Sequence, residues 1–175
     1  MAIISFTGLS GTGKSTIATN LANEKNYHYI SFNEEVHKLA SASHMTAHDY
    51  VKKYGIESTS KRANTHILSF IRSHDKKDII IDGLYDINLA NSIRSFNTNF
   101  IINVFAEWHM RVMRVANRKH IDLNEARCLC GLRDLYKFEL GVASIFKISD
   151  MLITNNDDIL SATNQCGIYL NKLRR

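Results

Sequence analysis

The feature that most constrains this chain is the stretch GLSGTGKST at residues 8–16, which directly follows the short apolar run AIISFT. Its spacing matches the pattern G-x-x-x-x-G-K-[ST] of a phosphate-binding loop. In such a loop the glycines let successive backbone N–H groups point at a phosphate, and the helix that follows directs the positive end of its dipole at the same anion. The pattern therefore predicts that the chain binds a nucleotide. The loop residues expected to contact it are Gly8, Ser10, Gly11, Thr12, Gly13, Lys14, Ser15 and Thr16.

The rest of the chain alternates between strand-like and helix-like segments. Strands that alternate with helices form parallel βαβ units, so we predict an α/β protein with a five-stranded parallel sheet and helices on both faces, the three-layer P-loop NTPase fold. The length of 175 residues favours one domain over residues 1–175. The predicted strands are 2–7, 27–31, 78–83, 100–106 and 151–154, and the predicted helices are 14–24, 33–73 with a break at 53–55, 86–95, 107–118, 123–140 and 157–173.

Composition and charge narrow the class of protein. No apolar run reaches the length of a membrane span, the N-terminus lacks a leader pattern, and three cysteines do not make a disulfide framework, so a cytoplasmic protein away from the membrane is expected. The net charge of +5 suits phosphorylated small molecules as well as nucleic acid. His44-x-x-x-His48 lacks the adjacent glutamate of a metalloprotease helix, and Cys128-x-Cys130 lacks zinc spacing, so neither pair is predicted to bind a metal.

A second polar element follows the continuous apolar strand DIIID, which ends at Asp82 and Gly83. Ligands of a parallel sheet bind beyond the carboxyl ends of its strands, where the phosphate-binding loop also lies. We therefore predict that Lys14 reaches the β- and γ-phosphates of ATP, and that the Ser15 hydroxyl and the Asp82 carboxylate hold Mg²⁺. A simple Asp-Gly turn is the alternative interpretation of this element.

A bound nucleotide still leaves kinases, GTPase switches, helicases and transporter motors as candidates. The chain has no Asn-Lys-x-Asp segment of the kind that GTPases use to recognise their base, and helicases and transporter ATPases are usually longer. A short chain with an N-terminal loop and five arginines between residues 111 and 133 points to the kinases of small molecules.

Further motifs carry a family resemblance. These are SKR at 60–62, DIIIDGLYD at 78–86, RVMRVANR at 111–118 and LRDLYKFELGVASIFKISDMLITNN at 132–156. With the loop, they make the chain resemble the nucleoside monophosphate kinase branch of P-loop proteins. It is most similar to the archaeal adenylate-kinase-like and dephospho-CoA-kinase-like family, with some similarity to bacteriophage deoxynucleoside monophosphate kinases.

The resemblance implies roles for several residues. Arg114 and Arg118 resemble the arginines that border a lid at about 115–135, and Arg133 resembles the arginine that follows it. On closure their guanidinium groups would stabilise the charge of the transferring phosphoryl group. Within an acceptor-binding insert at about 32–75, Arg62 resembles an arginine that binds the acceptor's phosphate. Asn155, after the last predicted strand, would flank the ATP base.

The acceptor side departs from the family pattern. The family commonly has a Gly-Asp and then an arginine where this chain has SFNEEVHKL, and it often has an arginine where this chain has Tyr85. A small-molecule nucleotide acceptor is expected as the partner, nucleic acid is not, and the protein is expected to be a monomer or a homodimer. The acceptor-binding residues are predicted to be Glu34, His37, Arg62, Gly83 and Tyr85.

Three functional interpretations stay open. The chain could transfer the γ-phosphoryl group of MgATP to a (deoxy)nucleoside monophosphate or a similar phosphorylated acceptor. It could instead phosphorylate a hydroxyl acceptor such as dephospho-CoA or a nucleoside, with Glu34 accepting the proton. The third interpretation is a nucleotide-binding regulatory or assembly factor with weak ATPase activity.

Overall fold

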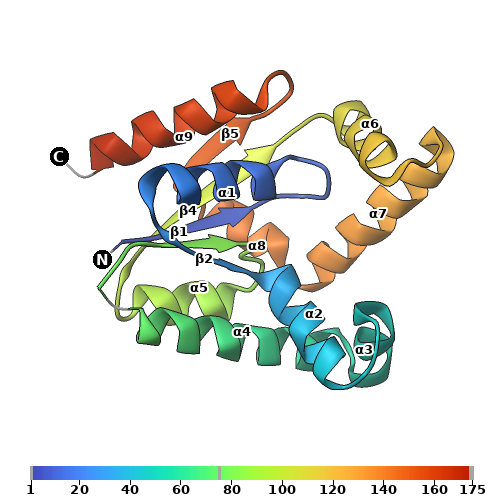
Figure 1. The fold of residues 1–175 in the computed structure, drawn as a ribbon, viewed down its shortest axis with the longest axis horizontal. Coiled ribbons are helices and arrows are strands. Elements are labelled where there is room, and N and C mark those ends of the chain that lie inside the picture. Colours follow the sequence, from blue (N-terminus) through green and yellow to red (C-terminus); the bar gives the residue numbers. More distant parts are fainter. Residues whose placement is uncertain (1, 75, 174–175) are drawn as a thin grey trace.

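A five-stranded parallel sheet forms the centre of the molecule in the computed structural model, which describes residues 2–74 and 76–173 (Figure 1). The strand order is β2-β3-β1-β4-β5, and every neighbouring pair is parallel, as the alternation of strands and helices predicts. The predicted domain limits at residues 1, 75 and 175 lie outside the described residues. The strands are β1 (Ala2–Thr7), β2 (His28–Ser31), β3 (Ile79–Asp82), β4 (Thr98–Phe105) and β5 (Met151–Thr154).

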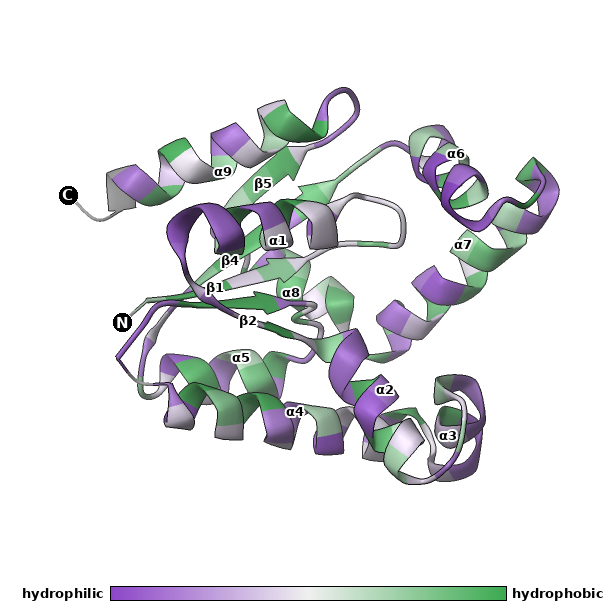
Figure 2. Cartoon of the chain, viewed as in Figure 1, coloured by the Kyte–Doolittle hydropathy of each residue, from purple (hydrophilic) through white to green (hydrophobic). Residues whose placement is uncertain are grey.

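Helices cover both faces of this sheet, so the predicted three-layer architecture is confirmed (Figure 1). One apolar cluster joins the sheet to α1 (Lys14–Lys25) and α9 (Ile159–Leu173). A second joins the opposite face to α4 (Ile56–Ser73), α5 (Ile87–Arg94) and α8 (Val142–Lys147). Successive side chains of a strand point to opposite faces, and burial on both sides explains why the strands are mostly apolar (Figure 2).

Two helical pairs extend beyond the carboxyl ends of the strands (Figure 1). The first pair is α2 (Phe32–Ala42) with α3 (Ala47–Tyr54), and the second is α6 (Trp108–Lys119) with α7 (Leu123–Glu139). The second pair has a small apolar core of its own, which contains Val115 and Cys130. Because that core is separate from the cores of the sheet, the α6–α7 pair is a distinct packing unit attached to the sheet edge.

Most strand and helix ends lie within two residues of the predicted ones, and two larger differences concern helices. The predicted helix over 33–73 is interrupted at Gly55, within the predicted break, but it also breaks between Ser43 and Thr46, where Thr46 caps α3 by accepting a hydrogen bond from Asp49 N. Helix α8 was not predicted at all. It has only six residues, Val142–Lys147, which is too few to leave a clear periodic pattern in the sequence. Its N-cap is Gly141, whose φ of 98° lies in the left-handed region.

The described residues contain no helix that combines the length and apolar character needed to cross a membrane.

Candidate active site

The loop of residues 8–13 joins β1 to α1 and owes its shape to its glycines. A Cβ atom on Gly11 would lie 2.6 Å from the carbonyl oxygen of Arg111, and one on Gly13 would lie 2.4 Å from Nδ2 of Asn155. Both glycines also have φ near 80° (79° and 85°), which L-residues with a side chain rarely adopt. The loop can therefore curve closely around its neighbours only with glycine at these positions, as the motif predicts.

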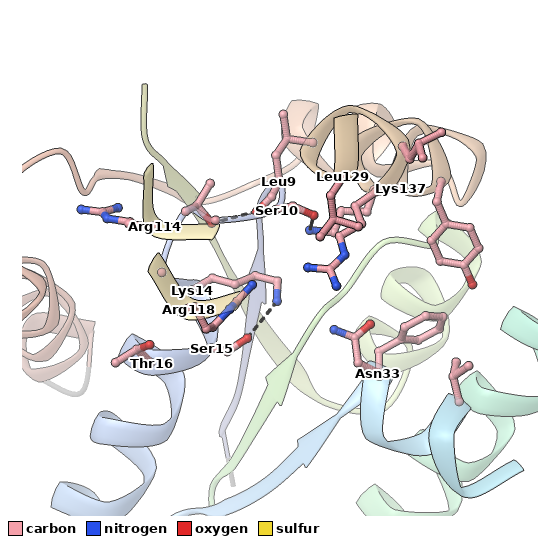
Figure 3. A pocket seen from close by; sticks show the side chains of 18 of the residues that line it. Leu9, Ser10, Lys14, Ser15, Thr16, Asn33, Arg114, Arg118, Leu129 and Lys137 are labelled. Atoms are coloured by element: carbon pink, nitrogen blue, oxygen red, sulfur yellow. Dashed lines mark hydrogen bonds between the residues drawn. The ribbon is translucent and has the colours of Figure 1, made fainter. Parts of the chain in front are cut away.

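Lys14 and Asp82, predicted separately as a phosphate-binding and a Mg²⁺-binding residue, form an ion pair in this structure that was not predicted. Lys14 Nζ lies 3.3 Å from the Ser15 hydroxyl (Figure 3). It also lies 2.7 Å from Asp82 Oδ1, and the hydroxyl of Tyr29 donates to Asp82 Oδ2 at 2.9 Å. Burial opposes the charged form of Lys14, but the electrostatic interactions with Tyr85 and Asp82 together outweigh it and raise the pKa of the ammonium group. Burial likewise opposes the charge on Asp82, and Lys14 overcomes it and lowers that pKa. Both groups are therefore charged.

This donor set fits a magnesium nucleotide. The glycine cradle leaves no room for side chains, and the Ser15 hydroxyl and Asp82 carboxylate bring two hard oxygen ligands next to Lys14. Across residues 2–74 and 76–173 no three His, Cys, Asp or Glu side chains come together as a metal site. A Mg²⁺ ion at this position would thus draw its remaining ligands from phosphate oxygens and water, as this metal commonly does.

A pocket of about 1240 Å³ opens over the loop, between the α2–α3 pair and the α6–α7 pair (Figure 3). The predicted residues Arg114, Arg118 and Arg133 all line it. Arg114 points away from Lys14 and donates to the carbonyl oxygen of Asn155 at 2.8 Å. The pKa of the Arg133 guanidinium is lowered, first by burial and then by repulsion from Arg118, which lines the same wall.

Asn155 forms the end of the pocket beside α9. Its Nδ2 donates to the carbonyl oxygen of Thr12 at 2.8 Å, which ties the segment after β5 to the loop. Its Oδ1 is buried and accepts no hydrogen bond from the described residues. Asp157 and Asp158 line the same end. Asn155 therefore lies against the loop and keeps one buried acceptor atom, while its contact with the ATP base stays a prediction.

The opposite end of the pocket is lined by α2, α3 and α7. Tyr136 of α7 lines it, and burial raises the pKa of its hydroxyl to about 12. That hydroxyl is buried and has no hydrogen-bond partner among the described residues. His37, His48 and Lys52 bring cationic or titratable side chains to this end. The other lining residues of the two helical pairs at this end are Phe32, Asn33, Val36, Ala47, Val51, Leu129 and Leu132.

Only one of the predicted acceptor residues, His37, lines the pocket. Glu34 is exposed and is not part of the lining. Arg62 is held away from it, because its Nη1 donates to the Tyr50 hydroxyl at 2.8 Å and its guanidinium lies 5.0 Å from the ring centre of Tyr54.

Gly83 and Tyr85 also lie outside the lining, behind Phe32. The Tyr85 ring is buried in edge contact with Phe32, with the ring centres 5.5 Å apart. Its side chain covers Gly83, where a Cβ atom would lie 3.1 Å from Tyr85 Cε2. Gly8, at the start of the loop, and Asp82, paired with Lys14, are likewise buried and do not line the pocket.

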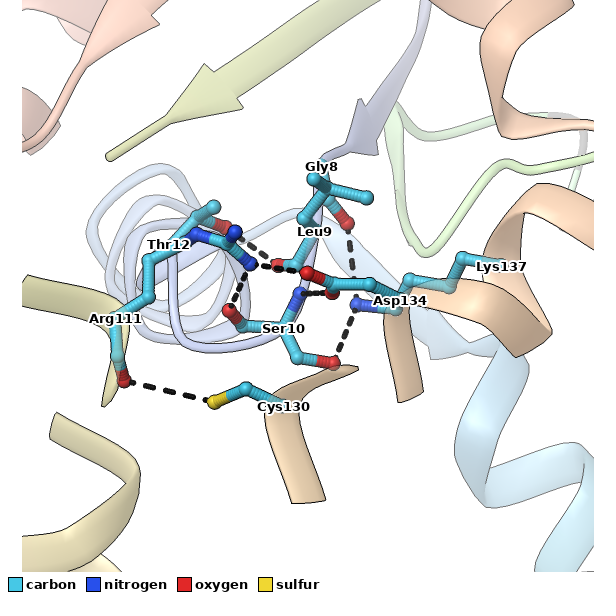
Figure 4. Close-up of polar contacts among 8 residues, drawn as sticks. All are labelled: Gly8, Leu9, Ser10, Thr12, Arg111, Cys130, Asp134 and Lys137. Carbon is cyan, nitrogen blue, oxygen red and sulfur yellow. Dashed lines mark hydrogen bonds and ion pairs between the residues drawn. The ribbon is translucent and has the colours of Figure 1, made fainter. Parts of the chain in front are cut away.

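A buried polar network that was not predicted anchors the loop to α6 and α7 (Figure 4). Arg111 Nη1 lies 2.6 Å from Asp134 Oδ2 and donates to the carbonyl oxygen of Ser10 at 3.0 Å. Asp134 Oδ1 accepts from Ser10 N at 2.9 Å. Lys137 Nζ donates to the Gly8 carbonyl oxygen and the Ser10 hydroxyl, both at 3.2 Å. The i, i+3 spacing of Asp134 and Lys137 places them on one face of α7, and that spacing is the only trace of the network in the sequence.

Comparison with known proteins agrees with this geometry. A UPF0200 protein of Pyrobaculum aerophilum is 27% identical over 176 residues, which cover 98% of each chain. Shikimate kinase from Bacteroides thetaiotaomicron superposes with a TM-score of 0.69 at 14% identity, over 97% of this chain and 98% of that one. A gluconokinase from Sinorhizobium meliloti superposes with a TM-score of 0.67 at 11% identity, over 98% and 93%. At these identities the superpositions establish a P-loop kinase-like fold.

The family itself follows from the sequence match. The family model described as an AAA domain matches residues 7–126, which is more than half of the chain and includes the phosphate-binding loop, Asp82 and both arginines of α6 that line the pocket. The chain therefore belongs to the AAA domain family of P-loop proteins and has a kinase-like fold.

Proposed function

We propose that this protein is a phosphotransferase that moves the γ-phosphoryl group of MgATP to a (deoxy)nucleoside monophosphate or a similar small phosphorylated acceptor. The observation that carries the proposal is that one pocket is lined by Lys14 and Ser15 of the loop, by Arg118 and Arg133, and by a separate group from α2 and α3. A donor site and an acceptor site on either side of shared positive charge is the arrangement that phosphoryl transfer requires.

On the donor side, Lys14 would exchange part of its ion pair with Asp82 for contacts with the β- and γ-phosphates. The Ser15 hydroxyl would be a direct ligand of Mg²⁺, and Asp82, below the pocket surface, would hold its water shell. When bound, Mg²⁺ would supply positive charge that offsets the negative charge of the β- and γ-phosphates. Arg118 and Arg133 would stabilise the phosphoryl group as it moves. Because Arg118, Leu129, Leu132 and Arg133 line the pocket, residues 115–135 are the lid of the domain in this proposal.

On the acceptor side, the segment 32–75 would bind the second substrate. Phe32, Val36 and Tyr136 offer an apolar wall suited to a planar base, while His37 and Lys52 offer charge for its phosphate. Glu34, Gly83, Tyr85 and Arg62 do not line the pocket as it stands, so any direct role for them needs a movement of α2 to α4.

The test measures ADP release with MgATP against a panel of nucleoside and deoxynucleoside monophosphates, with dephospho-CoA, shikimate and gluconate included. We expect turnover with at least one monophosphate. Lys14→Ala should lower it by about a hundredfold or more, because a phosphate-binding charge is lost from the site. Lys147→Ala is the matched control, since Lys147 is an exposed lysine on α8 outside the pocket. Turnover that depends on no acceptor in the panel would refute the proposal.

A hydroxyl acceptor is the second candidate, and the position of Arg62 favours it. No arginine of α2, α3 or α4 lines the pocket, because Arg62 is bound to Tyr50 instead. An acceptor without a phosphate would need no such arginine. Turnover with shikimate, gluconate or dephospho-CoA and none with monophosphates would select this candidate. Since Glu34 is exposed and outside the lining, Glu34→Gln should leave that turnover unchanged.

A further inference from the structure

Lys137 is a second lysine at the phosphate-binding loop, and it comes from the far end of α7. Its side chain is buried, with 9% of the residue's surface exposed, and it lines the pocket. Its Nζ donates to the Gly8 carbonyl oxygen and to the Ser10 hydroxyl, each at 3.2 Å (Figure 4). Two donors satisfy two acceptors, which is the full donor capacity of an uncharged amine.

Lys137 differs from Lys14 in its lack of a counter-charge. Lys14 is paired with Asp82 at 2.7 Å, whereas Lys137 has no ion pair with any residue of the described part of the chain. Asp134, one turn earlier on α7, is engaged by Arg111 and by Ser10 N. The structure therefore holds a buried amine beside a phosphate-binding loop whose hydrogen bonds go only to neutral acceptors, while the nearby carboxylates of Asp134 and Asp82 are engaged by Arg111 and Lys14.

The two lysines approach the same buried ring. Lys14 Nζ lies 5.9 Å and Lys137 Nζ lies 5.6 Å from the ring centre of Tyr85. Burial, and then repulsion from Lys14, lower the pKa of Lys137 well below its ordinary value. An anion bound between the loop and α7 would reverse this effect, because it would supply the charge that Lys137 lacks.

We propose that Lys137 is a phosphate-binding residue that takes up a proton from solvent when a nucleotide polyphosphate binds, so that a neutral amine becomes an ammonium group at the site. The proton passes from water or buffer to the lone pair of Nζ, and no other bond is made or broken. This inference rests on the proposed nucleotide-binding function and adds a second lysine to it. Lys137 thereby contributes positive charge only when an anion is present to balance it.

Calorimetric titration with a non-hydrolysable ATP analogue and Mg²⁺ tests the proposal. Titrations at one pH in two buffers of different ionisation enthalpy give the number of protons taken up, and the series is repeated from about pH 6 to about pH 9. The wild-type protein should take up protons on binding. Lys137→Met should abolish the part of the uptake that is due to this residue and weaken binding by about tenfold or more, the size expected for a lost charged hydrogen bond. Lys147→Met, a change of the same chemistry on an exposed residue of α8, should match the wild type.

The outcomes separate this inference from the function on which it rests. Wild-type binding with equal affinity and equal proton uptake in Lys137→Met overturns the role of Lys137 and leaves the nucleotide site intact. A failure of the wild-type protein to bind the analogue overturns both. If Lys137→Met does not fold, the wild-type titrations decide alone, because binding without proton uptake at every pH contradicts the proposal.

Discussion

At the scale of single residues, the buried pair of Lys14 and Asp82 combines stability with function. The side chains are 6% and 2% exposed, so each charge depends on the other for compensation. Removing one member leaves the other buried and unpaired, which costs more than the pair contributes. The pair is thus a place where substitutions aimed at activity also change the free energy of unfolding.

Asp82→Asn should lower the free energy of unfolding by about 3 kcal/mol, because Lys14 keeps its charge and loses its partner. The double variant Lys14→Met with Asp82→Asn should recover much of that loss, since no unpaired charge remains. Urea denaturation of the wild type, the two single variants and the double variant gives the coupling energy. Additive effects of the two substitutions would contradict a coupled pair.

Lys137 gives the stability a pH dependence of known sign. Its pKa is lower in the folded protein than the ordinary 10.5, so between those two values the unfolded chain binds more protons. Stability should therefore rise with pH in that window, by up to about 1.4 kcal/mol per pH unit from this residue. Urea denaturation of wild type and Lys137→Met at several pH values below 10.5 should show the two curves diverging as the pH falls, to the disadvantage of the wild type. Parallel curves would show that the pKa of Lys137 is not lowered.

At the scale of elements, α7 both anchors the loop and lines the pocket. Asp134 and Lys137 face the loop, while Arg133, beside Asp134 in the chain, lines the pocket. The position of Arg133 is consequently tied to the buried ion pair of Arg111 with Asp134, which is also the contact between α6 and the loop.

Asp134→Asn should therefore slow phosphoryl transfer, although Asp134 does not line the pocket. It leaves Arg111 buried beside a neutral amide, so we expect turnover to fall by roughly tenfold to a hundredfold, as is typical when positioning is lost. The readout is kcat and KM for ATP, together with the thermal unfolding temperature. Glu139→Gln, on an exposed residue at the end of α7, is the control. Unchanged kinetics in Asp134→Asn would refute the positioning role.

The cysteines provide a reporter for the α6–α7 pair. Cys128 is exposed on α7, whereas Cys130 and Cys166 are buried, and burial raises the pKa of Cys166 to about 12. A thiol reagent should accordingly modify one cysteine rapidly in the native protein and three in urea. Peptide mapping should place the rapid site at Cys128. A rapid reaction at Cys166 would contradict its burial under α9.

Element boundaries were predictable only where the sequence has a residue, such as glycine, that commonly ends a helix or strand. The break at Gly55 was predicted, because glycine there adopts a φ of 80° that few other residues tolerate. The break between Ser43 and Thr46 was missed, since His44, with a left-handed φ of 53°, gives no such signal. The turn lets α3 pack against α2 and α4, and that tertiary arrangement leaves no glycine or proline signal in the sequence.

At the scale of the whole molecule, the phosphate-binding loop joins the sheet to α1 and, through its buried hydrogen bonds, to α6 and α7. A ligand that binds there contacts only the folded state and should stabilise the entire chain, by about 2.7 kcal/mol at a concentration of 100 Kd. MgATP should thus raise the thermal unfolding temperature, and EDTA should remove most of the shift because Mg²⁺ is part of the site. Lys14→Ala should show little shift with MgATP. A shift that survives EDTA unchanged would argue against the metal.

The loop, the order of strands and helices along the chain and the location of Lys14 and Asp82 at the same end of the sheet were determined by the sequence itself. Each depends on local spacing, or on the rule that parallel strands carry their ligands at their carboxyl ends. Tertiary structure alone decided that Lys137 donates a hydrogen bond to the Gly8 carbonyl oxygen and that Arg62 donates one to the Tyr50 hydroxyl. Helical spacing says which residues share a face of α7, but the face is matched to the loop, more than a hundred residues away, only when α6 and α7 pack on each other and on the sheet edge.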